Sequence, residues 1–252
     1  MKKMDPSLKA LQILETLSDS GKEGMGITDL ATKSGLTKST AHRIVNALVE
    51  AGYLVRKDAT KTYTLGFRIL HVTASLMDSL EIKEVARPYL NRLWEESKET
   101  VHLVQLDGLQ AVYIDKIDTP HTIGLLSKVG KRLMLHSTAT GKIFLAYMSP
   151  EERQKIYTEV GLPQRTPHTL CSIPALEEEL ETIKNKGYAI DRMENKEGIY
   201  CIAGPIFSEN GQVINSFSIS GPSFRFTEKD VENLAVQVKE TSYGLSRDLV
   251  QF

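Results

Sequence analysis

Leucines recur at helical spacing near the start of the chain. From Leu8 to Leu17 every third residue is leucine, which predicts an amphipathic helix, and the polar, glycine-containing run SDSGKEGMG ends it. A shorter helix is predicted to begin at Thr28, which can cap it, and to end at Gly35, a residue suited to a left-handed turn. The chain therefore opens with two helices and a sharp turn.

The next segment, TKSTAHRIVNALVEAGYL, has an apolar face and a polar face. Ala41, Ile44, Val45 and Leu48 follow the spacing of a buried helical face, and no carboxylate interrupts the opposite face before Glu50. Two short helices joined by a glycine-containing turn, the second with such a polar face, are typical of a helix-turn-helix. The predicted contacts to phosphates or base edges are Thr37, Lys38, Ser39, Thr40, His42, Arg43 and Asn46.

Two short alternating segments, YLVR and TYTL, follow around a polar turn and predict a β-hairpin. A hairpin in this position is the wing of a winged helix-turn-helix. Its basic residues Arg56, Lys57 and Lys61 would lie near phosphates and add salt-dependent affinity without reading sequence. The alternative is a small helical module whose polar face is only solvated.

The charge distribution favours DNA binding by this first part of the chain. The 252 residues carry a net charge of −1, which by itself does not suggest a nucleic-acid partner. Residues 1–66, however, carry ten Lys and Arg against seven Asp and Glu, whereas the remainder carries 21 against 25. The basic surplus therefore lies where the helix-turn-helix is predicted.

The remaining pattern predicts an α+β domain with an antiparallel sheet. Helices are expected over 67–81, 82–97, 138–148, 150–160, 174–185 and 227–249. Strands are expected at TVHLVQLDG, QAVYIDKID, HTIGLLSK, YAIDRM, YCIAGPIF and VINSFSIS. Such a sheet can cup a ligand beneath its covering segments. We therefore divide the chain into a DNA-binding domain (1–66), a linker helix (67–81) and a sensor domain (82–252).

A candidate anion site lies where a glycine-containing loop leads into an apolar helix. Free backbone N–H groups near Ala139 and Thr140, together with the positive end of the helix dipole, would hold a carboxylate without an arginine. The alternative is that Ser137 only caps this helix.

Four polar residues lie on or beside predicted strands: Asp191, Cys201, Ser218 and Ser220. The two serines share a face because they are two residues apart, although all four could instead be satisfied core positions. An enzyme with Cys201 as nucleophile, assisted by His136 or Asp191, lacks a nucleophile-elbow motif. A metal sensor built from the same three residues lacks an established ligand spacing. We therefore expect no enzyme activity, no metal and no cofactor.

Cysteine content and hydropathy indicate the compartment. Cys171 and Cys201 make no disulfide framework in a chain of this length. No run approaches the roughly 18 to 20 apolar residues of a membrane span, and MKKMDPSLKA lacks the apolar stretch of a signal peptide. We expect a cytoplasmic protein with reduced thiols and no membrane partner.

The chain resembles the IclR family of transcription regulators over essentially its whole length. The resemblance lies in GITDLATKSGLTKSTAHRIVNALVEAGYL, LHSTATGKIFLA, GYAIDRMENKEGIYCIAGPIF and GQVINSFSISGP. It implies a winged helix-turn-helix, a linker helix that dimerises and a GAF-like effector domain in a homodimer or homotetramer. It also implies that the protein binds double-stranded operator DNA sequence-specifically and that a small organic acid controls this binding. We expect the protein to be a repressor.

The resemblance further implies which residues hold the effector. Polar and backbone contacts carry over to Ala139, Thr140, Asp191, Cys201, Ser218 and Ser220, with apolar walls at Leu125, Leu133 and Met134. The family often has proline where Met134 stands. Two stretches, ETVHLVQLDGLQAVYIDKID and GPSFRFTEKD, look most like the 2-keto-3-deoxygluconate repressors of pectin breakdown. This similarity implies a keto-deoxy sugar acid as the effector.

Overall fold

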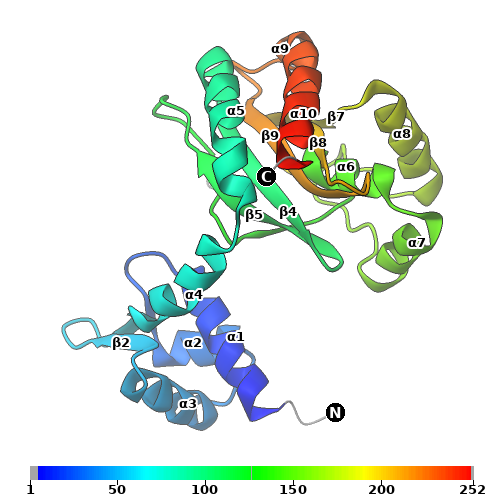
Figure 1. Cartoon of the computed structure of the whole chain (residues 1–252). Helices are drawn as coiled ribbons and strands as arrows, with labels where there is room; N and C mark the ends of the chain where they lie inside the picture. The colour runs from blue at the N-terminus through cyan, green and yellow to red at the C-terminus, as the bar shows by residue number, and fades with distance from the viewer. Residues whose placement is uncertain (1–4, 126, 251–252) are drawn as a thin grey trace. The chain divides into compact units, whose positions relative to one another are not determined.

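The computed structural model describes residues 5–125 and 127–250, and Figure 1 shows the order of the elements along the chain. The chain forms two compact units that divide between Leu80 and Glu81, and each is described separately. None of the helices within these described ranges is both long and apolar enough to cross a membrane.

The first unit contains the predicted helices and hairpin, but the predicted cap at Thr28 is wrong, because α2 begins at Ile27 and Gly26 is its N-cap. Its elements are α1 (Pro6–Ser18), β1 (Met25–Gly26), α2 (Ile27–Lys33), α3 (Lys38–Glu50), β2 (Leu54–Lys57), β3 (Thr62–Leu65) and α4 (Arg68–Asp78). Gly35 takes a positive φ of 62° in the turn between α2 and α3, which glycine adopts without steric cost. Ile13, Leu30 and Val45 from the three helices are buried together in the core. β1, β3 and β2 form a small antiparallel sheet.

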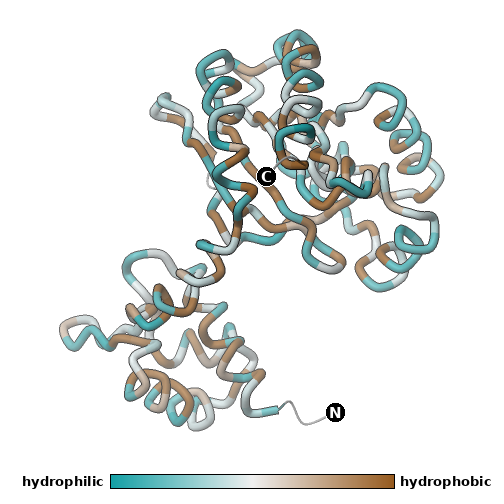
Figure 2. The backbone as a smooth tube through the Cα atoms, in the orientation of Figure 1, coloured by the Kyte–Doolittle hydropathy of each residue, from teal (hydrophilic) through white to brown (hydrophobic). Residues whose placement is uncertain are grey.

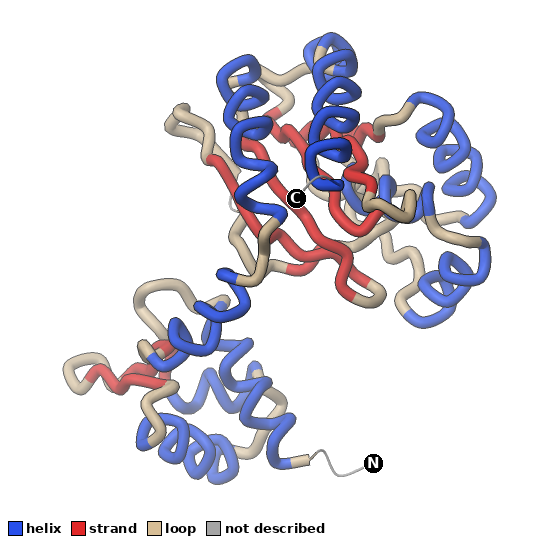
Figure 3. Tube along the Cα trace, in the orientation of Figure 1, coloured by secondary structure: helices blue, strands red, loops and turns tan. Residues whose placement is uncertain are grey.

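The second unit is built on one antiparallel sheet of six strands in the order β6-β5-β4-β9-β8-β7 (Figure 3). The strands are β4 (Thr100–Asp107), β5 (Gln110–Ile117), β6 (Arg132–Leu133), β7 (Ala189–Arg192), β8 (Ile199–Phe207) and β9 (Val213–Pro222). The helices are α5 (Ile82–Ser97), α6 (Ala139–Tyr147), α7 (Pro150–Glu159), α8 (Ile173–Lys186), α9 (Glu228–Asn233) and α10 (Ala235–Val250). This is the predicted α+β architecture.

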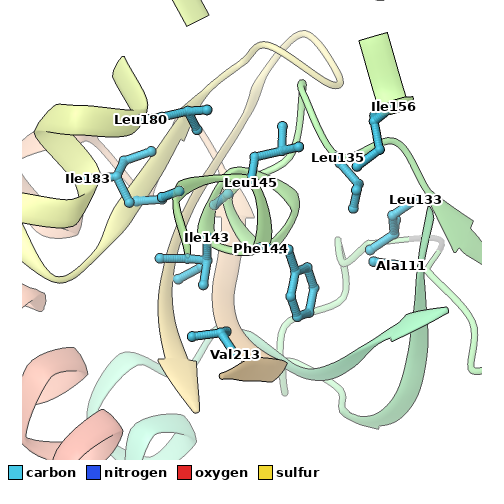
Figure 4. Packing of buried hydrophobic residues seen from close by; sticks show 14 of the residues in the cluster. Ala111, Leu133, Leu135, Ile143, Phe144, Leu145, Ile156, Leu180, Ile183 and Val213 are labelled. Atoms are coloured by element: carbon cyan, nitrogen blue, oxygen red, sulfur yellow. The ribbon is translucent and has the colours of Figure 1, made fainter. Parts of the chain in front are cut away.

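Helices cover both faces of this sheet. α5 and α10 lie side by side on one face (Figure 1), while α6 packs on the other face beneath α8. The central strands β4 and β9 mix hydrophobic and polar residues (Figure 2), although almost all of their positions are buried or half-buried. On the α6 face, Ile143, Phe144 and Leu145 pack with Leu133 and Ala111 of the sheet (Figure 4). The α6 face is the one that carries the candidate ligand site.

One predicted strand, HTIGLLSK, is wrong. Residues 121–125, 127 and 128 form a loop, and Leu126 lies outside the described residues. Side chains rather than a neighbouring strand satisfy the loop's carbonyl groups: Arg225 donates to the carbonyl of Ile123 at 2.7 Å, and Lys116 donates to those of Leu125 and Ser127 at 3.2 and 3.0 Å. The predicted last helix is also interrupted at Leu234, between α9 and α10.

Candidate functional site

The polar face of α3 is open to solvent. Ala41, Ile44 and Val45 are buried on the opposite side of the helix, which fixes its rotation. Thr37 caps the helix by accepting a hydrogen bond from the backbone N–H of Thr40 at 3.3 Å. Of the residues predicted to contact DNA on this helix, Thr40 is half-buried and the others are exposed: Thr37, Lys38, Ser39, His42, Arg43 and Asn46.

The wing presents its three basic residues to solvent, and two of them have partners within the unit. The Arg56 guanidinium lies 3.6 Å from the Asp58 carboxylate, and Lys57 donates to the carbonyl of Lys22 at 2.7 Å. Lys61 occupies the hairpin turn with a φ of 55°. The bond from Lys57 ties the wing to the loop between α1 and β1.

A cavity of about 330 Å³ lies on the α6 face of the sheet in the second unit. This volume is near the lower end of the range for small-molecule sites, so it suits a metabolite. The residues predicted for the effector that line it are Leu125, Leu133, Met134, Asp191, Cys201 and Ser220. They come from β6, β7, β8 and β9 and from the loops before and after β6.

Strand register explains how the polar residues of the cavity come together. Asp191 of β7 stands opposite Cys201 of β8, which stands opposite Ser220 of β9, so the three side chains form a row on one face. The preceding pair, Ala189 and Ala203, is small and buried beneath α6. The sheet thus changes from an apolar surface under the helix to a polar floor one step further along each strand.

Three other residues predicted for the effector are buried but are not in the cavity lining. Ala139 and Thr140 lie in the first turn of α6, where the Thr138 hydroxyl accepts from the N–H of Gly141 at 3.1 Å. Ser218 lies on the same face as Ser220, but its hydroxyl is 3.4 Å from Nδ1 of His102.

Several lining residues were not identified from the sequence: Gln110, Tyr113, Ser127, Lys131, Arg132, Arg165, Asn195, Lys196 and Ile199. Tyr113 belongs to a predicted alternating strand, so the period-2 pattern could have placed it on the same face as Ala111. Arg165 and Lys196 lie in loops, where the sequence pattern gives no orientation. Their contribution depends on tertiary contacts.

The loop that carries Arg165 is fixed to the turn after β7 by hydroxyl groups. The Thr169 hydroxyl donates to the carbonyl of Glu194 at 2.6 Å and accepts from the N–H of Arg165 at 3.0 Å. The Thr166 hydroxyl donates to the carbonyl of Met193 at 2.7 Å. These bonds hold Arg165 beside the β7 edge of the cavity.

The floor of the cavity is poor in negative charge despite its carboxyl group. Burial, followed by the nearby Glu194 carboxylate, raises the pKa of Asp191 from 3.8 to about 7. Burial, followed by Asp191, also raises the pKa of the Cys201 thiol well above its ordinary value. Near neutral pH, the floor therefore offers a thiol and a carboxyl group that is protonated in a large part of the molecules.

His102 of β4 is buried next to two residues that line the cavity, Tyr113 and Ser127. Its Nε2 lies 2.7 Å from the Ser127 hydroxyl, and its ring stacks near Tyr113 with centroids 4.4 Å apart. Burial, followed by the positive charge of Lys116, lowers the pKa of His102 to about 3, so the imidazole is neutral. Its two ring nitrogens lie within hydrogen-bonding distance of the Ser127 and Ser218 hydroxyls, so His102 positions neighbouring residues and is not itself in the cavity lining.

A buried ion cluster lies behind the floor. The Lys142 ammonium of α6 is fully buried and lies 2.7 Å from Glu194 and 3.0 Å from Glu179. The backbone N–H of Glu194 donates to the Asp191 carboxyl at 2.7 Å. The cluster therefore connects α6 and α8 to the carboxyl group that lines the cavity.

The geometry disfavours the two alternative readings of Cys201. The Cys201 thiol has a raised pKa, and His136, the proposed base, is bonded instead to the carbonyl of Pro163 at 3.0 Å. Over residues 5–125 and 127–250, no three or more His, Cys, Asp or Glu side chains are grouped so that they could hold a metal ion.

Comparison with known proteins identifies both parts of the chain. Residues 8–58 match the IclR helix-turn-helix domain, and residues 74–247 match the C-terminal domain of the bacterial transcriptional regulator IclR. Both matched families are families of transcriptional regulators, not of enzymes.

Individual relatives cover nearly the whole chain. The transcriptional regulator KdgR of Dickeya chrysanthemi is 32% identical over 95% of this chain and 78% of its own length. The transcriptional repressor AllR of Escherichia coli K12 is 31% identical over 96% of this chain and 89% of its own. A crystal structure of an IclR homologue from Microbacterium hydrocarbonoxydans in complex with 4-hydroxybenzoate superposes with a TM-score of 0.80, at 26% identity, over 98% of this chain and 100% of that one.

Proposed function

Because the chain belongs to the IclR family of bacterial transcriptional regulators, we propose that it is a repressor whose operator binding is controlled by a small organic acid. The cavity on the α6 face carries this proposal, since it combines a hydrogen-bonding floor with basic side chains. A relative named as a repressor supports repression, and a relative crystallised with an aromatic acid supports an acidic ligand.

We assign DNA binding to residues 1–66, with α3 as the recognition helix and the β2–β3 hairpin as the wing. Their solvent-exposed polar and basic groups support this assignment. Residues 67–81 form the linker, and the exposed Phe67, Leu70 and Leu76 on it support a role in pairing two chains. A homodimer or homotetramer in the cytoplasm would then place two recognition helices on successive half-sites.

The effector proposed for residues 82–252 is a keto-deoxy sugar acid. The similarity to KdgR supports this class, and the cavity supports it chemically. Asp191, Ser220 and Tyr113 can exchange hydrogen bonds with hydroxyl groups, while Arg165 can pair with a carboxylate.

The regulatory step requires only a modest free-energy coupling. A tenfold change in operator affinity corresponds to about 1.4 kcal/mol of difference in effector binding between the DNA-bound and free conformations. A few hydrogen bonds in the cavity can supply that difference. Effector binding would act on the fit of both recognition helices at once.

Fluorescence anisotropy tests this function directly. Labelled DNA from the region upstream of the protein's own gene is titrated with the full chain, with and without 2-keto-3-deoxygluconate. We expect specific binding that the acid weakens by about tenfold or more. Asp191→Ala should abolish the response to the acid while leaving DNA binding intact. Specific DNA binding that no sugar acid changes would refute the proposed effector class.

A further inference from the structure

Three basic side chains of the cavity have no acidic partner. Lys131, Arg165 and Lys196 line it, and throughout the described ranges no carboxylate oxygen lies within 4.0 Å of their cationic nitrogens. Arg132, which also lines the cavity, is paired with Asp107. We refer to Lys131, Arg165 and Lys196 as the basic rim. It gives the cavity a surplus of positive charge.

The basic rim comes from the two opposite edges of the sheet. Lys131 directly precedes β6, one edge strand, and its carbonyl accepts from the N–H of Tyr113 at 3.2 Å. Lys196 follows β7, the other edge strand, and the hydroxyl bonds from Thr166 and Thr169 hold Arg165 beside it. Positive charge thus stands at both ends of the cavity.

The floor between these ends carries hydrogen-bonding groups rather than full charges. The edge strands β6 and β7 are separated by five strand spacings, or about 24 Å between backbones along the sheet. Tyr113, Ser220 and Cys201 lie within this span. The residues of the basic rim nevertheless all line one cavity of about 330 Å³, so the space between them suits a small molecule.

We propose that the cavity recognises an extended polyhydroxy acid with an anionic group at each end, one bound by Lys131 and the other by Arg165 and Lys196. This inference rests on the proposed effector function and adds to it a second anionic group, which 2-keto-3-deoxygluconate lacks and which sugar diacids and phosphorylated sugar acids carry. A monocarboxylate would leave the cations at one end unpaired. The polar floor would bond the hydroxyl groups between the two charges.

Isothermal titration calorimetry with the full chain tests the proposal with two acids that share one carbon skeleton. D-Gluconate carries one carboxylate, and D-glucarate carries one at each end. We expect glucarate to bind about tenfold more tightly or better, as one additional charge-assisted contact in a partly exposed site implies. Raising the salt concentration should reduce this preference.

Variants locate the preference on the basic rim. Lys131→Met, and the double variant Arg165→Gln with Lys196→Gln, should each lower glucarate affinity to about the level of gluconate. Gluconate keeps a cation at the other end, so its affinity should change little and shows that each variant is folded. Lys128→Met, which neutralises an exposed lysine outside the cavity lining, should leave the preference unchanged.

The failure of this inference differs from the failure of the proposed function. If gluconate binds as tightly as glucarate, the cavity is a monocarboxylate site and the two-ended recognition is refuted. If both rim variants still prefer glucarate over gluconate, recognition of the two ends by the basic rim is refuted as well. If 2-keto-3-deoxygluconate releases DNA but glucarate does not bind, the inference alone fails. If no acid binds and DNA binding is unaffected by any of them, both the inference and the proposed effector class fail.

Discussion

Replacement of Lys142 by methionine should strongly destabilise the second unit. The Lys142 side chain is fully buried, and that of its partner Glu194 is only 6% exposed. One oxygen of Glu194 already lacks a hydrogen-bond partner. Removing one member of such a buried pair leaves an uncompensated charge and costs about 3 to 5 kcal/mol. For a unit of this size, that loss corresponds to a melting temperature lower by about 6 to 20 °C.

Tryptophan fluorescence can follow this unit selectively. Trp94 is the one tryptophan of the chain, and it lies in α5 with its indole N–H donating to the carbonyl of Asp118 at 2.8 Å. Urea unfolding followed at Trp94 therefore reports the second unit. The exposed Lys155 on α7 offers a matched control, since Lys155→Met should change the free energy of unfolding by less than about 0.5 kcal/mol.

A double variant separates the effect of charge from that of packing. If the loss in Lys142→Met comes from the isolated Glu194 carboxylate, adding Glu194→Gln should recover a large part of it. Recovery of less than about 0.5 kcal/mol would attribute the loss to packing instead. A single variant as stable as the wild type would refute the reasoning altogether.

Three further predictions concern the DNA-binding surface and the floor of the cavity. Arg43→Ala should weaken operator binding by about 1 to 3 kcal/mol in anisotropy titrations. Effector binding, measured by calorimetry, should stay intact, and loss of both activities would contradict separate DNA-binding and effector-binding sites. Lys61→Ala should weaken binding to all DNA sequences alike and reduce the slope of log affinity against log salt by about 1, whereas a loss confined to the operator would argue against a phosphate contact. The pKa of Asp191 is raised from 3.8 to about 7 in the folded protein. Its contribution to the free energy of unfolding is therefore fully present below pH 3.8 and is lost as the pH rises to 7. Because Asp191 becomes negatively charged over this range, the affinity for an anion should weaken between pH 6 and 8 in the wild type but not in Asp191→Asn. Equal pH profiles of the two proteins in calorimetry would exclude Asp191 as the titrating group.

The sequence predicted the first unit well because its signals are local. The helices of the helix-turn-helix follow from apolar spacing, and Gly35 and Thr37 supply the turn and the cap that separate them. The hairpin after α3 follows from alternation around a polar turn. Each of these features depends on residues a few positions apart.

The cavity was predicted less completely because it depends on contacts between distant residues. The row formed by Asp191, Cys201 and Ser220 depends on strand register, which the sequence alone does not determine. The family resemblance identified these residues, but the pattern of the chain did not. Arg165 reaches the cavity because the hydroxyl groups of Thr166 and Thr169 in its own loop bond to the carbonyl groups of Met193 and Glu194, which lie 27 and 25 residues further along the chain. No periodicity encodes such a contact.

The loop at residues 121–125 and 127–128, predicted as part of a strand, also shows how tertiary contacts override local pattern. Arg225 and Lys116 bond to carbonyl groups of this loop, and every amino acid supplies a carbonyl. The path of the loop at Leu125, which lies in the wall of the cavity, therefore depends little on the side chain displayed there. Substitutions at such positions can change which ligand fits while the supporting scaffold stays the same. One fold can in this way acquire new chemical specificities through exchange of a few wall residues.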